Sequence, residues 1–187
     1  MASKTTPKLI LIVSGSAGMG KDTFVAQIAK HKPTAHVHIA DKAKHAAFYI
    51  GWNGRKDEKG RKLLSDLKIA IDEFNDGCFS YVCEITEKFL ANEGSYAGIE
   101  CLCIYMRESK DIKRFSNMYE CYSVCVFDDR KEHITSNIAD AEVFNHPFDF
   151  VIKNCDTIEN LESRAIVLLS MITHTNGQKR GECIEII

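Results

Sequence analysis

The sequence predicts an α/β protein in which a five-stranded parallel sheet carries helices on both faces. Two observations support this fold class: short apolar runs alternate with helical patterns, and the first run opens directly into a glycine-rich turn. Such alternation is typical of parallel strands that are joined by helical crossovers. We expect strands at Lys8 to Ser14, His36 to Ala40, Glu100 to Met106, Cys121 to Phe127 and Phe148 to Lys153.

Two helices are expected in succession between the second and third strands. The segment Lys62 to Phe74 has apolar residues along one helical face, and a second helical pattern runs from about Cys78 to Phe89. A βαβ crossover needs only one helix, so the extra helix predicts an insertion at about 42–95. We expect this insertion to bind a second substrate.

The last helix is expected at Thr157 to Ile172, with Asp156 as its N-cap and Glu159 completing a capping box. The tail from Thr173 has a loop-like composition. With 187 residues and no interdomain linker, the chain is expected to form a single domain, residues 1–187.

Composition narrows the class of protein. The 24 basic and 26 acidic residues nearly cancel, so the overall charge offers no attraction to nucleic acid or to an anionic membrane. No apolar run approaches the ~18 residues of a membrane-spanning helix, and the first run is too short for a secretory signal. None of the eight cysteines forms a Cys-x-x-Cys pair, so we interpret them as buried thiols of a cytoplasmic protein.

The glycine-rich turn after the first strand predicts a phosphate-binding loop. A strand that breaks into such a turn and restarts as a helix directs backbone N–H groups and the positive end of the helix dipole at one point. The spacing of Gly15, Gly20 and Lys21 fits the Walker A pattern, in which the lysine reaches the outer phosphates of a nucleotide. The expected nucleotide-binding residues are Gly15, Ser16, Ala17, Gly18, Met19, Gly20, Lys21, Asp22 and Thr23.

Asp22 departs from this pattern, which places a serine or threonine after the lysine to bind magnesium. The hydroxyl comes one residue later, at Thr23. Carboxylate oxygen is a ligand that Mg²⁺ accepts, so the sequence leaves open whether Asp22 or Thr23 ligates the metal.

Two other interpretations of the turn compete with a phosphate loop. Gly15, Gly18 and Gly20 also approximate a dinucleotide fingerprint, with Asp41 placed as the ribose-binding acid. That interpretation leaves Lys21 unexplained, and no tyrosine is followed four residues later by a lysine, as a short-chain dehydrogenase needs. The other interpretation is a tight turn without a ligand, which the flanking strand and helix patterns disfavour.

Charged side chains follow the other expected strands. Ligands of open parallel sheets bind at the carboxyl ends of the strands. Those ends are followed by Asp41 for the second strand, by Arg107 and Glu108 for the third, by Asp128, Asp129 and Arg130 for the fourth, and by Asn154 for the fifth. Asp41 alone could equally be the N-cap of the next helix.

A turn-rich stretch from Gly51 to Arg61 holds four cations and the only tryptophan. These cations could bind an acceptor phosphate while Trp52 stacks on a base. A solvated loop with Trp52 in the core is the equally weighted alternative. The candidate substrate-binding residues of this stretch are Trp52, Arg55, Lys56 and Arg61, with Lys59 beside them.

The chain resembles the small P-loop kinases, and among them the bacteriophage-type deoxynucleoside monophosphate kinases. The likeness rests on Gly-Lys-Asp-Thr at Gly20 to Thr23, on Ala40-Asp41-Lys42 with Lys44, on Met106-Arg107-Glu108 and on the run Phe148 to Asn154. It spans about Lys8 to Leu169. The resemblance implies a three-layer P-loop NTPase fold, ATP and Mg²⁺ as cofactors, and a (deoxy)nucleoside monophosphate as acceptor.

The resemblance also assigns roles to residues. Lys21 would hold the β and γ phosphates, Arg107 would grip the acceptor phosphate, and Arg130 would close on the transferring group from a lid at about 130–147. Asp41 and Lys44 would contact the acceptor. The loop at Asn154 would border the adenine. Such kinases usually carry an acid two residues before the arginine, where this chain has Tyr105.

Several alternatives stay open. A hydroxyl acceptor would need Asp41 as a general base, as in kinases similar to dephospho-coenzyme A kinase, whereas a phosphate acceptor would not. The non-enzymatic alternative to a kinase is a P-loop module that binds ATP or GTP as a sensor and has lost catalysis. A GTPase is disfavoured, because Lys153-Asn154-Cys155-Asp156 transposes the order that guanine recognition needs. We expect small-molecule nucleotides as ligands, and the sequence does not decide between a monomer and a homodimer.

Overall fold

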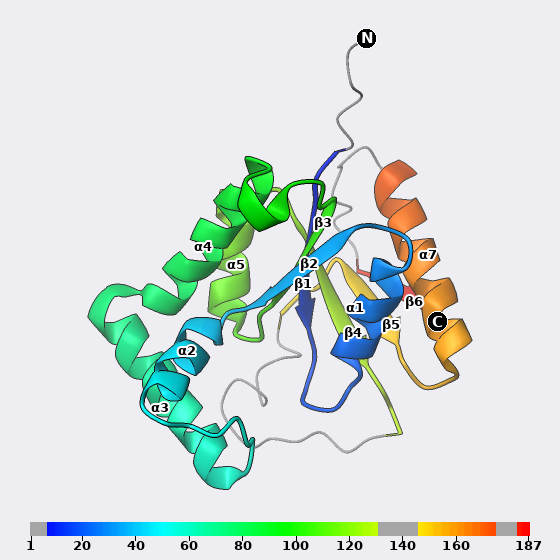
Figure 1. The fold of residues 1–187 in the computed structure, drawn as a ribbon. Coiled ribbons are helices and arrows are strands. Elements are labelled where there is room, and N and C mark those ends of the chain that lie inside the picture. The colour runs from blue at the N-terminus through cyan, green and yellow to red at the C-terminus, as the bar shows by residue number, and fades with distance from the viewer. Residues whose placement is uncertain (1–6, 131–145, 175–182) are drawn as a thin grey trace. The chain divides into compact units, whose positions relative to one another are not determined.

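A computed structural model describes residues 7–130, 146–174 and 183–187 of the chain. Its centre is a six-stranded sheet in the order β2-β3-β1-β4-β5-β6 (Figure 1). The strands are β1 (Leu9–Ser14), β2 (Thr34–His38), β3 (Cys101–Tyr105), β4 (Tyr122–Phe127), β5 (Phe150–Lys153) and β6 (Ile184–Ile186). β1 pairs in parallel with β3 and β4, and β4, β5 and β6 continue the parallel sheet. The expected class, a parallel α/β sheet, is confirmed.

The strand count was one too low. The five expected strands are present, each shifted or shortened by one or two residues, and β6 lies in the tail that was expected to be loop. β6 has only three residues and owes its place to pairing with β5, where Ile152 lies opposite Ile186. A contact between such distant segments leaves no periodic signal in so short a run.

Helices cover both faces of this sheet. α1 (Lys21–Ala29) and α7 (Ile158–His174) lie on one side and α5 (Ser109–Met118) lies on the other (Figure 1). The core beneath α1 and α7 takes alternate strand residues, including Leu11 and Val13 of β1, together with Phe24 of α1. Because β1 is fully buried, its residues Leu9 to Val13 are apolar on both faces, as expected for a central parallel strand.

The chain divides into two compact units, and each is described by itself. The first comprises residues 1–36 and 98–187 and contains strands β1, β3, β4, β5 and β6. The second, Val37–Ala97, contains α2 (Asp41–Tyr49), α3 (Glu58–Asn75), α4 (Gly77–Leu90) and the short helix η1 (Gly94–Tyr96). The insertion predicted at about 42–95 falls within this second unit.

Two predicted helix starts were displaced by one residue. Asp41 is the first residue of α2, not its N-cap. Asp156 does not cap α7 either: the backbone N–H of Asn160 donates to Oγ1 of Thr157 at 3.3 Å. Both carboxylates have other partners. That of Asp41 accepts from the backbone N–H of His38 and from Lys44, and that of Asp156 forms an ion pair with Arg164 at 2.5 Å.

All eight cysteines are free thiols, and five of them are buried. Cys101 and Cys103 project from the same face of β3 with their sulfurs 3.9 Å apart. Within the described residues, no cluster of three or more histidine, cysteine or acidic side chains could hold a metal ion. The interpretation as buried thiols holds for the five buried cysteines, whereas Cys83 and Cys155 are half-buried and Cys183 is exposed. No helix in the described part of the chain is long and apolar enough to span a membrane.

Candidate functional site

The glycine-rich segment forms a loop from the end of β1 to the start of α1. Gly15, Gly18 and Gly20 have φ angles of 131°, 78° and 85°, a region that side chains rarely adopt. Gly20 is the N-cap of α1, and its carbonyl oxygen accepts the first helical hydrogen bond from Phe24 at 2.9 Å. The loop therefore delivers the chain to the N-terminus of α1, where the helix dipole favours an anion.

Two of these glycines are also required by close packing. A Cβ atom on Gly15 would lie well under 3.0 Å from the backbone oxygen of Val126, and one on Gly20 would overlap the side-chain amide of Asn154. At Gly18, by contrast, a Cβ would meet no atom within 4 Å. The loop is therefore held against β4 and the β5 loop on one side, while its middle is open to a ligand.

Lys21 lies across this loop. Its Nζ donates to the carbonyl oxygens of Gly15 at 2.7 Å and Ser16 at 2.6 Å. These acceptors are neutral, so an arriving phosphate would offer the ammonium a stronger, charge-assisted partner. The hydroxyls of Ser14 and Ser16 are fully buried and make no hydrogen bond to any described residue, which is costly unless a ligand or water completes them.

Asp22 and Thr23 lie in the first turn of α1, and both are exposed. Tyr105 at the end of β3 is buried. Burial raises the pKa of Tyr105, and the negative charge of Asp22 raises it further, so the phenol stays protonated.

Asn154 connects three of the loops at this edge of the sheet. Its Nδ2 donates to the carbonyl oxygen of Met19 at 3.0 Å, and its backbone N–H donates to Phe127. Its own carbonyl oxygen accepts from Nη2 of Arg130 at 3.2 Å. Through the bond to Met19, Asn154 contacts the phosphate loop. Its expected place beside the adenine stays a prediction.

Arg130 is bound to Asp128, a residue that was expected at the end of the fourth strand but was given no role there. Nε and Nη2 of Arg130 donate to the two carboxylate oxygens at 2.9 and 3.1 Å. The Asp128 side chain is only 1% exposed and the Arg130 side chain is 57% exposed. The pair neutralises a buried carboxylate next to the phosphate loop. The predicted lid, about 130–147, otherwise lies outside the described residues except for His146 and Pro147.

Arg107 follows β3 and is half-buried, so it lies at the same carboxyl edge of the sheet as the phosphate loop. Glu108 is the N-cap residue of α5 and forms an ion pair with Lys110 at 3.0 Å. The first unit therefore brings the phosphate loop, Arg130 and Asn154 together through hydrogen bonds, with Arg107 on the adjacent strand.

In the second unit, Asp41 and Lys44 are joined. Oδ1 of Asp41 accepts from Nζ of Lys44 at 2.7 Å, and Oδ2 accepts from the backbone N–H of His38 at 2.8 Å. Burial acts to raise the pKa of Asp41, but the hydrogen bonds from Lys44 and His38 and the nearby positive charge outweigh it. The net result is a lowered pKa, so Asp41 is ionised at neutral pH.

The cationic stretch of the second unit is organised around Trp52. The indole ring packs on Phe48 with centroids 4.8 Å apart, and Nε1 donates to the carbonyl oxygen of Arg55 at 3.0 Å. Nε of Arg61 donates to the carbonyl oxygen of Lys56 at 2.9 Å. Trp52 is half-buried, whereas the four cations are exposed. Trp52 thus packs on Phe48 of α2 and is hydrogen-bonded within its own loop.

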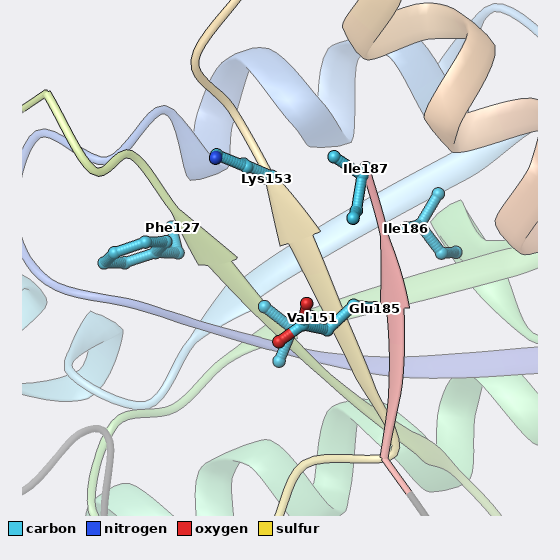
Figure 2. A pocket seen from close by; sticks show the side chains of 6 residues that line it. All are labelled: Phe127, Val151, Lys153, Glu185, Ile186 and Ile187. Atoms are coloured by element: carbon cyan, nitrogen blue, oxygen red, sulfur yellow. The ribbon is translucent and has the colours of Figure 1, made fainter.

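A small pocket lies at the β4-β5-β6 side of the sheet (Figure 2). Its volume of about 140 Å³ is below the ~300–1,000 Å³ of typical ligand pockets. Val151 and Glu185 lie opposite each other in the strand register and both line it. Its lining residues are Phe127, Val151, Lys153, Glu185, Ile186 and Ile187. We do not regard it as the nucleotide site, because it is too small and holds no phosphate-loop residue.

Comparisons with known proteins identify the fold. No protein-family model matches the chain, and no curated protein matches its sequence. TT1252 from Thermus thermophilus superposes with a TM-score of 0.51 and 15% identity over 89% of this chain and 98% of that one. An unliganded sugar kinase from Janibacter sp. HTCC2649 gives 0.50 and 13% over 88% and 95%. At such identities the likeness concerns the fold alone.

Proposed function

We propose that the protein is a phosphotransferase that moves the γ-phosphoryl group of ATP to a (deoxy)nucleoside monophosphate. The observation that carries the proposal is the loop between β1 and α1, with three glycines in positive φ and Lys21 lying across it. Phosphoryl transfer demands alignment and charge neutralisation rather than covalent participation by the protein. A rigid loop with one cation provides both.

The loop residues fit a triphosphate. Gly18 leaves the middle of the loop open, and the buried hydroxyl of Ser16 has no partner among the described residues. The N-terminus of α1 directs its backbone N–H groups and the positive end of its dipole to the same place. In this proposal the loop amides bind the phosphate oxygens, and Lys21 exchanges its carbonyl partners for the outer phosphates.

Asp22 and Thr23 are the residues that would hold Mg²⁺. Both present oxygen atoms at the surface of the first turn of α1. Mg²⁺ commonly binds through one or two protein oxygens and completes its shell with phosphates and water, so a larger acidic cluster is not required. When bound, Mg²⁺ would neutralise charge on the phosphates.

The ionisation of Asp41 favours a phosphate acceptor over a hydroxyl acceptor. A general base works best when its pKa is near the working pH, and the pKa of Asp41 is lowered instead. A monophosphate oxygen is already anionic and needs no base. Asp41 and Lys44 would then position the acceptor, together with Arg107 and the exposed cations Arg55, Lys56 and Arg61. Arg130 would act on the transferring group after exchanging Asp128 for phosphate.

A coupled assay for ADP release tests the proposal. Purified protein, ATP and Mg²⁺ are combined with each nucleoside and deoxynucleoside monophosphate, with dephospho-coenzyme A, and with a simple sugar. We expect stimulation by one or more monophosphates. Stimulation by only dephospho-coenzyme A or a sugar would establish a different small-molecule kinase. ATP binding with no stimulation by any acceptor would favour the sensor.

Lys21→Ala and Lys30→Ala form a matched pair for this assay. Lys30 follows α1 and is paired at the surface with Glu162 at 2.6 Å, so its loss should leave transfer unchanged. Lys21→Ala should lower kcat/KM by at least ~100-fold, because it removes the cation at the transferred group. Retained turnover in Lys21→Ala would refute the assigned site.

A further inference from the structure

Asn154 is fixed to the sheet through its backbone. Its N–H donates to the carbonyl oxygen of Phe127, the last residue of β4, at 2.6 Å, and its own carbonyl oxygen accepts from Nη2 of Arg130 at 3.2 Å. The preceding carbonyl oxygen, that of Lys153, accepts from Nη1 of Arg164 at 2.6 Å, and the Arg164 side chain is only 8% exposed. Strand β4 and helix α7 therefore determine where the Asn154 side chain begins.

The side chain of Asn154 reaches the turn just before α1. Its Nδ2 donates to the carbonyl oxygen of Met19 at 3.0 Å. A carbonyl oxygen can only accept, so the amide has to present its NH₂ group here. The amide lies so close to Gly20 that a Cβ atom there would overlap it. The missing side chain of Gly20 thus lets the amide bind the peptide group that joins Met19 to Gly20.

This hydrogen bond determines which way the N–H of Gly20 points. The Met19–Gly20 peptide is trans, so its carbonyl oxygen and its N–H point in opposite directions. Because the oxygen is directed at Asn154, the N–H is directed away from it. That N–H makes no hydrogen bond to any described residue. It is therefore a backbone donor at the start of α1 that a phosphate oxygen can use.

We propose that Asn154 is a positioning residue of the phosphate loop, which holds the Met19–Gly20 peptide so that the Gly20 N–H donates to a bound phosphate. This inference rests on the proposed function. The family resemblance implies that the loop at Asn154 borders the adenine, whereas here Asn154 acts through the phosphates. The two roles differ in an observable way. A residue that acts through the phosphate loop affects any polyphosphate ligand, whereas a residue beside the adenine affects only ligands that carry a base.

Lys21 and Asn154 secure the loop in different ways. Nζ of Lys21 donates to the carbonyl oxygens of Gly15 and Ser16. In the proposed function, Lys21 exchanges these oxygens for the outer phosphates. Asn154 is neutral and its amide keeps the same carbonyl partner, so its hydrogen bond persists in the complex. Loss of the Asn154 amide should therefore lower ligand affinity as well as stability.

The test measures the binding of ATP and of inorganic tripolyphosphate, both in excess EDTA, by calorimetry on the full chain. Tripolyphosphate carries no base, so it reports on the phosphate loop alone. In Asn154→Ala we expect both affinities to fall by about 10-fold, because a backbone donor to a charged phosphate is no longer held in place. Asn160→Ala is the matched control: Asn160 is exposed in the first turn of α7, and its side chain makes no hydrogen bond to any described residue. Its affinities should be unchanged.

The outcomes separate the inference from the proposed function. A fall in ATP affinity with unchanged tripolyphosphate affinity would place Asn154 beside the base and overturn the inference. Wild-type affinity of Asn154→Ala for both ligands would also overturn it while leaving the proposed function intact. A wild-type protein that binds neither ligand would refute the proposed function, and the inference with it.

Glycine-selective ¹⁵N labelling provides a second measurement that a purely structural role would not move. When wild type is saturated with tripolyphosphate, the amide proton of Gly20 should shift downfield, because the phosphate accepts from it. In saturated Asn154→Ala the shift should be smaller, and an equal shift would contradict the inference. A Gly20 resonance of wild type that does not respond would overturn it as well, even where Asn154→Ala fails to fold.

Discussion

Gly15→Ala tests whether the phosphate loop depends on close packing against β4. Gly15 has a φ of 131°, and a Cβ atom there would lie well under 3.0 Å from the carbonyl oxygen of Val126. That oxygen belongs to β4, a strand paired on both sides with β1 and β5, so it cannot move aside. The substitution therefore has to displace the loop itself.

The magnitude follows from two costs. A side chain in this region of φ costs about 1–3 kcal/mol. Moving the loop by about 1 Å to restore van der Waals separation is an overpacking cost of about 1–3 kcal/mol more. We expect the free energy of unfolding to fall by about 4 kcal/mol, which is a large share of the ~5–15 kcal/mol of a typical domain. ATP affinity should also fall, because the amides move with the loop.

Gly18→Ala is the matched control, since its φ is 78° but a Cβ there meets no atom within 4 Å. Its cost should be only the left-handed strain of about 1–2 kcal/mol. Urea denaturation gives both free energies, and calorimetry with ATP gives both affinities. Equal destabilisation by the two substitutions would refute the reasoning, because the contact with Val126 would then contribute nothing.

The remaining predictions concern the loop anchor, the acid limb of stability and thiol reactivity. Gly20→Ala should lower the free energy of unfolding by about 2 kcal/mol in urea denaturation, because it strains the backbone and displaces the hydrogen bond of Asn154. In an Asn154→Ala background the same substitution should cost only about 1 kcal/mol. Equal costs in the two backgrounds would contradict the contact. The folded-state pKa of Asp41 lies below 3.8, so its charge stabilises the protein above that pH and this contribution is lost as the pH falls through the lowered pKa. Asp41→Asn should therefore be less stable at neutral pH, and its free energy of unfolding should fall less steeply between roughly pH 7 and 2 in urea titrations. An equally steep fall in wild type and variant would contradict this assignment. Burial raises the pKa of Cys125 to about 12, so a thiol reagent at about pH 8 should modify exposed Cys183 in the native protein and Cys125 only after unfolding, as peptide mass mapping would show.

The sequence was most informative where structure follows from neighbouring residues. The run Gly15 to Lys21 encodes its own turn, because glycine spacing decides where φ can be positive. The strand residues Leu9 to Val13 are all apolar because the strand is buried on both faces. Such local and periodic signals are readable without any knowledge of which segments pair.

Asp41 shows that the residues next to a position do not always determine its role. Its position before a helix is equally compatible with an N-cap and with the first helical residue. The structure resolves this through the His38 N–H and the Lys44 ammonium, which both bind its carboxylate. An acid with two such partners is ionised and positioned, and this property is invisible in a motif.

Strand order and the partners of the loop were decided only by the tertiary structure. Val13 and Tyr105 are far apart in the chain and lie side by side because β3 pairs with β1 in parallel. Asn154 reaches Met19 for a similar reason, and β6 exists only through its pairing with β5. Backbone conformation depends on neighbouring residues, whereas these contacts depend on which segments share an edge, and that information is distributed over the whole chain.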